Sequence, residues 1–204
     1  MKSELYFEFE NEFRGSCSEI ISRFSTYDGL LNHIKDKFES PNLLDIGSGR
    51  GEWIQKCSEL GIDATGLEMN ANMISLCRNK GLNVKEGNAL DRLKRYHSAS
   101  FSLVSAFHFI EHINYQEIFD LLEECKRIIK PGGVLILETP SIDNLQVASR
   151  TFYIDPTHIT PINPDTINFI LQKIGFDSTK YFFINGNNVE ETNQNNSISD
   201  VLSA

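Results

Sequence analysis

Three side chains that can carry protons or bind metals lie within five positions of one another in the stretch SAFHFIEHI, residues 105–113. They are His108, Glu111 and His112. An imidazole titrates near neutral pH and can serve as a general base, and imidazole and carboxylate groups together bind divalent ions. The spacing therefore indicates acid–base chemistry or a metal site. The structural alternative is the polar start of a helix that buries the aromatic and aliphatic side chains between them.

A further histidine, His158, ends the proline-bounded loop sequence IDPTH. If the loop returns to the same place, two hypotheses remain open. In the first, His112 or His158, beside Glu111, is a general base for an acceptor hydroxyl. In the second, His108, Glu111, His112 and His158 bind one divalent ion, and the histidine at 108 favours zinc, manganese or iron over magnesium. The letters also match the inverted zinc-protease pattern H-x-x-E-H, but that pattern lies deep within a helix, whereas this one ends an apolar strand.

Strand-like and helix-like patterns alternate along the chain, which predicts an α/β fold with a mostly parallel sheet and helices on both faces. The carboxyl edge of such a sheet is where ligands bind, and the fourth strand ends there just before His108. The predicted strands are residues 42–46, 63–68, 83–87, 101–107, 134–140 and 181–184. The predicted helices are residues 7–38 with a break near 26–29, then 52–60, 71–80, 115–129 and 165–173.

A glycine-rich turn follows the first predicted strand in LLDIGSGRGEW. Glycines at such a turn let the backbone approach a ligand closely. Glu52 occupies the place of the third small residue of a dinucleotide fingerprint, and no phosphate-loop lysine is present, so an uncharged or zwitterionic ligand is predicted. Glu68 ends the second strand and can accept both hydroxyls of a ribose. Met69 can lie against an adenine or fill the core, and Asn88 can contact the adenine amino group or simply form a turn.

In this order and spacing, the motifs LDIGSGRGEW, GLEMN, GNAL, SAFHFIEHI, LLEECKRIIKPGGVLILETP and FYIDPTH resemble class I S-adenosylmethionine-dependent methyltransferases, from about residue 9 to residue 183. The resemblance implies a Rossmann-like sheet in the order 3-2-1-4-5-7-6, with strand seven antiparallel. No seventh strand is recognised in the sequence. The cofactor contacts that the resemblance implies are Asp45, Gly47, Ser48, Gly49, Glu68, Met69, Asn88, Ala89 and Phe107. The family usually has Asp at position 88, and Asn keeps an acceptor without the charge.

The segments FENEFRGSCSEIISRFSTY and TFYIDPTHITPINPDTI are similar to methyltransferases of bacterial surface-polysaccharide (O-antigen or capsule) biosynthesis. That resemblance implies that Arg14 and Gly15 close over the cofactor. It also implies that Arg23 and Tyr27 face the cofactor or the acceptor, with an exposed helix face as the alternative for both. Three segments are expected: an N-terminal helical cap (1–40), an S-adenosylmethionine-binding core (41–184) and a flexible polar tail (185–204).

The composition limits the partners. The formal net charge of −9 has no basic run to offset it, so nucleic acid is disfavoured as a partner. No apolar run is long enough to span a membrane, and four scattered cysteines favour a reducing cytoplasm over a disulfide or zinc framework. We expect a cytoplasmic protein. The alternative is a cytoplasmic protein that is attached to the inner membrane through an assembly complex.

The expected function is methyl transfer from S-adenosylmethionine to an oxygen of a sugar or sugar-linked phosphate, on an acceptor that is free or lipid-linked. Two alternatives remain open. One is a metal-dependent RNA 2′-O-methyltransferase, because small-RNA enzymes of that kind carry a similar E-x-x-E-H motif and a later histidine. The other is a non-catalytic cofactor-binding module of an assembly complex.

Overall fold

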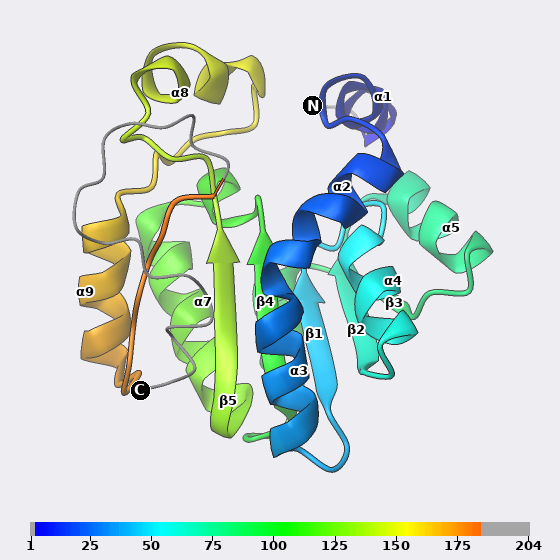
Figure 1. Cartoon of the computed structure of the whole chain (residues 1–204). Coiled ribbons are helices and arrows are strands. Elements are labelled where there is room, and N and C mark those ends of the chain that lie inside the picture. Colours follow the sequence, from blue (N-terminus) through cyan, green and yellow to red (C-terminus); the bar gives the residue numbers. More distant parts are fainter. Residues whose placement is uncertain (1–2, 185–204) are drawn as a thin grey trace.

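The computed structural model describes residues 3–184. It contains one five-stranded sheet in the order β3-β2-β1-β4-β5, and every neighbouring pair is parallel (Figure 1). The predicted α/β architecture is confirmed. The strands are β1 (Asn42–Ile46), β2 (Asp63–Glu68), β3 (Val84–Glu86), β4 (Phe101–Phe107) and β5 (Ile129–Glu138).

Helices cover both faces of the sheet, as predicted, and each face has its own apolar core. One face is covered by α2 (Cys17–Arg23), the 3-10 helix η1 (Phe24–Tyr27), α3 (Asp28–Lys37), α4 (Glu52–Glu59) and α5 (Ala71–Asn79). The other is covered by α6 (Ala89–Leu93), α7 (Tyr115–Ile128) and α9 (Pro164–Ile174). All seven residues of β4 are buried, because the strand lies inside the sheet between the two helical layers.

The remaining elements lie at the carboxyl edge of the sheet. They are α1 (Ser3–Phe13), the 3-10 helix η2 (Ile110–His112), α8 (Leu145–Ser149) and the 3-10 helix η3 (Thr151–Ile154). In Figure 1, α1 and α8 lie beyond the arrowheads of the strands, on either side of β4. The edge at which the sequence predicts a ligand is therefore flanked by helical segments from both ends of the described chain.

The N-terminal helical region is broken at a place that the sequence analysis did not predict. Gly15, with φ of +91°, separates α1 from α2, and Ser16 begins α2 with a capping box formed with Glu19. The predicted break at 26–29 is only a short 3-10 turn, η1, that continues directly into α3. Ile20, Phe24 and the buried side chains of α3 belong to the same core as α4 and α5.

The predicted sixth strand, residues 181–184, is wrong: no strand pairing is formed there. In the expected order, strand six pairs only with strand seven, and within the described residues no strand pairs beyond β5. Without that neighbour, the backbone groups of residues 181–184 have no ladder to join, and Tyr181 and Phe183 are exposed. The expected polar tail, 185–204, lies outside the described residues.

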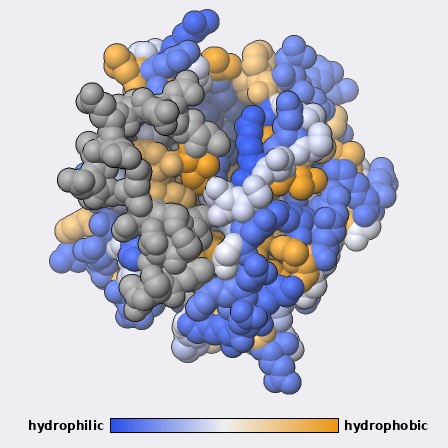
Figure 2. Space-filling view, in the orientation of Figure 1, coloured by the Kyte–Doolittle hydropathy of each residue, from blue (hydrophilic) through white to orange (hydrophobic). Residues whose placement is uncertain are grey.

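The surface of this molecule is mainly hydrophilic on the face drawn in Figure 2, with apolar areas between the polar ones. Among the helices of residues 3–184, none has the length and apolar character needed to cross a bilayer.

Candidate active site

The glycine turn, residues 47–51, connects β1 to α4 and needs its glycines. Gly47, Gly49 and Gly51 have φ of +70°, +52° and +81°, in the left-handed region. A Cβ on Gly47 would lie 2.5 Å from Cδ2 of Phe109. The turn is attached to the neighbouring strand, because the amides of Gly47 and Ser48 both donate to the carbonyl of Leu67, at 2.9 and 3.0 Å.

Glu68, at the end of β2, is attached to this turn. Its Oε2 accepts the amide of Gly49 at 2.9 Å, and its Oε1 accepts the amides of Met69 and Asn70, both at 2.8 Å. Each carboxylate oxygen has two lone pairs, so Oε2 keeps capacity for a hydroxyl. Met69 is 64% exposed and does not fill the core. The structure therefore places a carboxylate and an exposed side chain beside the turn, as a bound nucleoside would require.

Asn88 caps helix α6. Its Oδ1 accepts the amide of Asp91 at 3.3 Å, while the neighbouring Ala89 is buried. The alternative prediction for Asn88, a residue that forms a turn, is therefore met. Its side-chain oxygen, which was expected to contact the adenine amino group, already accepts the amide of Asp91. An adenine contact through Asn88 stays a prediction.

Two buried polar groups lie beneath the glycine turn. Asp45 is 3% exposed and accepts the hydroxyl of Ser105 at 2.7 Å. Burial raises the pKa of Asp45 to about 7, although the bond from Ser105 opposes the shift. The Oγ of Ser48 is buried and has no hydrogen-bond partner within residues 3–184. A buried hydroxyl without a partner next to a glycine turn fits a polar ligand there.

Arg14 and Gly15 lie over the turn. A terminal nitrogen of Arg14 is 3.4 Å from where a Cβ on Gly49 would be, and it pairs with Glu10 at 2.8 Å. Arg50, which the sequence analysis missed, fixes this arrangement: its Nη2 donates to the carbonyl of Gly15 at 3.0 Å and its Nε pairs with Glu52 at 2.8 Å. In the sequence, Arg50 and Glu52 stand on either side of Gly51, and this pair of opposite charges could have been noticed. Only the fold shows that both side chains are buried.

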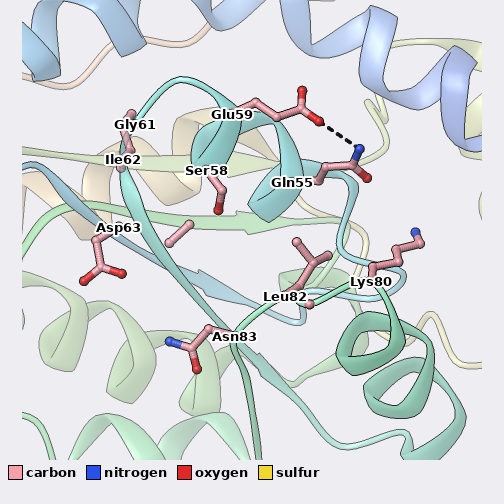
Figure 3. Close-up of a pocket in the computed structure, with 11 residues that line it drawn as sticks. Gln55, Ser58, Glu59, Gly61, Ile62, Asp63, Lys80, Leu82 and Asn83 are labelled. Carbon is pink, nitrogen blue, oxygen red and sulfur yellow. Dashed lines mark hydrogen bonds between the residues drawn. The ribbon is translucent and has the colours of Figure 1, made fainter.

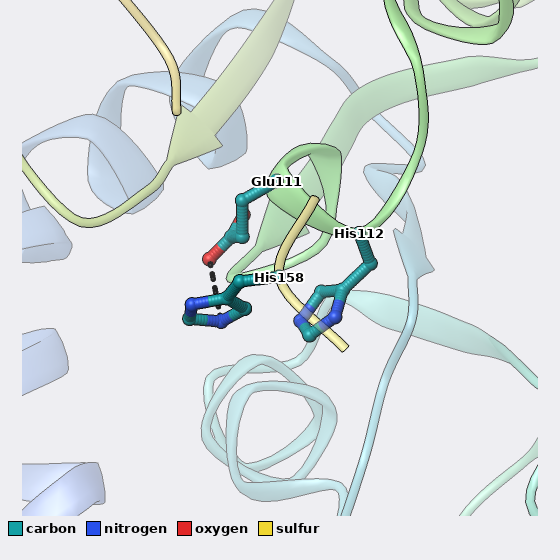
Figure 4. A group of neighbouring side chains, drawn as sticks. All are labelled: Glu111, His112 and His158. Carbon is teal, nitrogen blue, oxygen red and sulfur yellow. Dashed lines mark ion pairs between the residues drawn. The ribbon is translucent and has the colours of Figure 1, made fainter. Parts of the chain in front are cut away.

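The histidine cluster, defined as Glu111, His112 and His158, is assembled by backbone hydrogen bonds. The amides of Ile159 and Thr160 donate to the carbonyl of Glu111 at 2.9 and 3.0 Å, so the loop after α8 returns to η2. One ligand-capable atom from each of the three residues lies within 4.8 Å of the others (Figure 4). Burial lowers the pKa of His112, which favours the neutral imidazole.

His108 is not one of the three cluster residues, but its ring contacts Glu111 and lies between the carboxylates of Glu111 and Glu138. Its backbone φ is +51°, and its ring is 3.3 Å from Glu111 through Nδ1 and 3.5 Å from Glu138 through Nε2. Burial opposes ionisation, but the two carboxylates outweigh it and raise the pKa of His108 to about 9. In the same way, His108 holds the pKa values of Glu111 and Glu138 below their usual range against the effect of burial.

Phe107 and Tyr27 belong to a buried aromatic group. Phe107 packs against Phe24 and Trp53, with both ring centroids 5.0 Å away, so its side chain faces the core beside the site. Tyr27 is 4% exposed and its hydroxyl donates to Glu138 at 2.6 Å. The alternative of an exposed helix face is therefore wrong for Tyr27, whereas Arg23 is exposed and lines the cavity described next.

The acceptor cavity, a hollow of about 350 Å³, opens between α1, β4, β5 and the loop after α8. Its lining combines polar and apolar side chains. The apolar ones include Phe9, Phe13, Ile20, Ile154 and Ile184, and the polar and charged ones are Glu10, Arg14, Arg23, His108, His112, Glu138, Thr151, Asp155 and His158. A larger open hollow of about 960 Å³ lies at the amino end of β2 (Figure 3). We place the site in the smaller cavity, because ligands of open α/β sheets bind at the carboxyl ends of the strands.

The chain belongs to the methyltransferase domain family, which matches residues 9–181. S-adenosylmethionine is the methyl donor of this family, and the glycine turn with Glu68 fits its nucleoside. The fold is similar to the crystal structure of a SAM-dependent methyltransferase from Archaeoglobus fulgidus, with 34% identity and a TM-score of 0.77, over 91% of this chain and 86% of that one. The predicted class I methyltransferase fold is confirmed.

Among curated proteins, the chain is 24% identical over 122 residues to the demethylmenaquinone methyltransferase of Chlorobaculum parvum, covering 59% of this chain and 50% of that protein. It is 26% identical over 102 residues to the ubiquinone biosynthesis O-methyltransferase of Nitrosococcus oceani, covering 48% of this chain and 42% of that protein. The chain thus spans about half the length of these relatives.

Proposed function

We propose that this protein transfers the methyl group of S-adenosylmethionine to a hydroxyl oxygen of an acceptor bound in the acceptor cavity. The observation that carries the proposal is that the glycine turn with Glu68 and the cavity with its histidines lie at the same edge of one sheet. The donor supplies a methyl group on a positively charged sulfur, so the protein has to align the acceptor oxygen and take up its proton.

The residues divide these tasks. Glu68 and the glycine turn bind the nucleoside, and Arg14 over Gly49 offers a cation to the carboxylate of the methionine part. Proton uptake falls to the histidine cluster, because His112 and His158 line the cavity. Glu138, fixed by Tyr27 and His108, can accept a hydrogen bond from a second hydroxyl of the acceptor.

The proposed acceptor is a sugar or sugar-linked phosphate of a bacterial surface polysaccharide. It is supported by the resemblance of residues 9–27 and 151–167 to enzymes of that pathway and by the polar side chains that line the cavity, which suit an acceptor with several hydroxyls. The apolar side chains of the lining fit the lipid part of a lipid-linked intermediate. An aromatic hydroxyl is the second candidate, because these apolar side chains also suit a ring and the O-methyltransferase relative belongs to ubiquinone biosynthesis.

Labelled methyl donor tests both candidates. The protein is incubated with methyl-labelled S-adenosylmethionine and, separately, with lipid-linked glycan and quinone-precursor extracts. The proposal expects label in the glycan fraction, lost in Glu68→Ala and retained in His97→Gln, since His97 lies on an exposed loop away from the site. Label only in the quinone fraction would select the second candidate. Absence of transfer to either, with cofactor bound, would contradict methyl transfer to these acceptors and leave a cofactor-binding module.

A further inference from the structure

We propose that Glu111, His112 and His158 bind one divalent transition-metal ion beside the acceptor cavity, which His112 and His158 line. The ligands are a carboxylate oxygen of Glu111 and the Nε2 atom of each histidine. One ligand-capable atom of each residue lies within 4.8 Å of the others, and Figure 4 shows the carboxylate and both rings side by side. Metal–ligand bonds of about 2.0–2.2 Å require only a small further approach of these side chains.

His158 is held in the tautomer that a metal ligand needs. Its Nδ1 is 2.7 Å from the carbonyl oxygen of Phe152. A carbonyl can only accept, so Nδ1 carries a proton, and in the neutral ring Nε2 keeps its lone pair. That Nε2 atom lies 3.9 Å from Oε1 of Glu111 and 3.8 Å from Oδ2 of Asp155. A lone pair facing carboxylate oxygens is repelled by them, and a positive charge between these atoms, a metal ion or a proton on Nε2, removes the repulsion.

His112 is held in the same tautomer by a longer chain of hydrogen bonds. The hydroxyl of Thr157 donates to Oδ1 of Asp155 at 2.6 Å, because a carboxylate oxygen accepts. The Thr157 oxygen is then an acceptor for Nδ1 of His112, at 2.9 Å. The Nε2 of His112 therefore also presents a lone pair. Outer hydrogen bonds of this kind, from Nδ1 to a carbonyl or through a hydroxyl to a carboxylate, orient histidine ligands in metal sites.

Glu111 supplies the negative charge. Its side chain is 0% exposed, and neither carboxylate oxygen has a hydrogen-bond partner within the described residues. The ion pair with Nδ1 of His108 is 3.3 Å long, which exceeds the distance usual for a hydrogen bond between charged groups. A buried carboxylate without hydrogen bonds is costly, and an ion bound to it and to the two imidazoles removes that cost.

The ligand set indicates the kind of ion. Two imidazoles and one carboxylate suit the first-row ions from manganese to zinc better than magnesium or calcium, which prefer oxygen ligands. His108 is outside the set, because its two nitrogens already face Glu111 and Glu138. Three protein ligands leave a position open toward the cavity, where the ion can bind the acceptor hydroxyl and lower its pKa. With the ion bound, the hydroxyl proton leaves to solvent, and the two histidines act as ligands in place of proton acceptors. This role rests on the proposed methyl transfer, whereas binding of the ion does not.

Cobalt(II) is the probe for the site. After removal of bound metals with a chelator, Co²⁺ is titrated into the full chain by calorimetry and by visible absorption. One Co²⁺ per chain is expected, with absorption bands of a site containing nitrogen ligands, displaced by Zn²⁺ and unaffected by excess Mg²⁺. His112→Gln and His158→Gln should each weaken Co²⁺ binding by about tenfold or more.

Two matched variants separate this site from other histidines. His108→Gln should keep the one-to-one stoichiometry, since His108 is not a ligand, and His97→Gln should leave the affinity unchanged. S-adenosylhomocysteine binding, measured in the same samples, shows that each variant is folded and tests the proposed function separately. If neither ligand variant folds, X-ray absorption of the cobalt-loaded natural chain should show two imidazole ligands.

Three outcomes would overturn the proposal: no saturable Co²⁺ binding by the natural chain, unchanged affinity in both ligand variants, or an absorption spectrum without imidazole ligands. S-adenosylhomocysteine binding without Co²⁺ binding would leave the proposed function in place, with a histidine alone as proton acceptor. Co²⁺ binding without S-adenosylhomocysteine binding would support the ion and contradict the proposed function.

Discussion

At the level of single residues, His108 joins the buried carboxylate of Glu111 to Glu138, which lines the acceptor cavity. Its ring lies between Glu111 and Glu138, and Tyr27 donates to the other oxygen of Glu138. This chain of contacts connects η2, β5 and η1, which are far apart in the sequence. It keeps two carboxylates ionised beside the place where an acceptor would bind.

His108→Gln tests this arrangement through its pH dependence. The folded-state pKa of His108 is raised to about 9, so its contribution to stability is complete below the unfolded pKa of about 6.5 and is lost as the pH rises through about 9. Because the side chain is 45% exposed, we expect a loss of only about 0.5–1 kcal/mol near pH 6.

Urea unfolding of both proteins near pH 6 and near pH 9.5 measures the effect, since these conditions lie on either side of the folded-state pKa of about 9. The difference between natural protein and variant should shrink at the higher pH. His97→Gln is the control and should show no difference at either pH. An equal loss for His108→Gln at both pH values would contradict the ionic role of His108.

The sequence identified many site residues and missed others for a physical reason. His108, Glu111 and His112 were visible because they lie within one motif, and Glu68 because it ends a strand. The hydrogen bond between Tyr27 and Glu138 joins residues 111 positions apart, so no local sequence pattern could predict it. The tautomers of His112 and His158 depend on Thr157 and a backbone carbonyl, and only the fold brings these together.

At the level of elements, the glycine turn is restricted both by backbone conformation and by close neighbours. A Cβ on Gly51 would lie 2.6 Å from Cδ1 of Leu82 and 2.9 Å from Sγ of Cys77. Gly61 has the same φ of +81° and no neighbour within 4 Å of its Cβ position. The two glycines form a matched pair that separates backbone strain from steric contact.

Gly61→Ala should lose about 1–2 kcal/mol of unfolding free energy, the cost of a left-handed conformation for alanine. Gly51→Ala should lose about 1–3 kcal/mol more, because α5 and the segment before β3 must move. Chemical denaturation measures both. Equal losses of unfolding free energy in the two variants would contradict this prediction, because the contacts of a Cβ at position 51 with Leu82 and Cys77 would then not destabilise the protein.

The strands and long helices were predictable because their apolar patterns are local. The buried run of residues 101–107 and the helical stripe of residues 115–128 both appear in the structure with nearly the predicted ends. Residues 181–184 had the right composition for a strand and failed because a strand also needs a neighbour, which no local pattern reports. The break at Gly15 was hidden because apolar residues continue on both sides of it.

At the level of the whole molecule, the net charge of −9 bears on the choice of acceptor. A phosphate backbone is attracted by clustered lysine and arginine, and affinity from that source falls steeply with salt. The cavity lining carries Arg14 and Arg23 together with Glu10, Glu138 and Asp155, so it forms no basic surface of its own. The acidic net charge of the chain therefore favours a small hydroxylated acceptor over RNA.

Fluorescence anisotropy with a labelled RNA duplex and a single strand checks this inference. No saturable binding is expected at about 0.15 M salt, with or without the cofactor product. The same titration at lower salt is the control, because electrostatic binding to a phosphate backbone becomes stronger as the salt concentration falls. Binding that is tight and falls steeply with salt would favour the RNA 2′-O-methyltransferase alternative instead.

The central claim is that Glu68 and the glycine turn bind the nucleoside of a sulfonium donor. Isothermal calorimetry with S-adenosylhomocysteine tests it directly, with Glu68→Ala compared to Glu86→Ala, since Glu86 is the exposed register partner of Glu68 on β3. We predict one site per chain, unchanged in Glu86→Ala and weakened by about tenfold or more in Glu68→Ala, the loss expected when a hydrogen-bonding carboxylate is removed. Absence of binding to the natural chain, or equal affinity in both variants, would contradict the account.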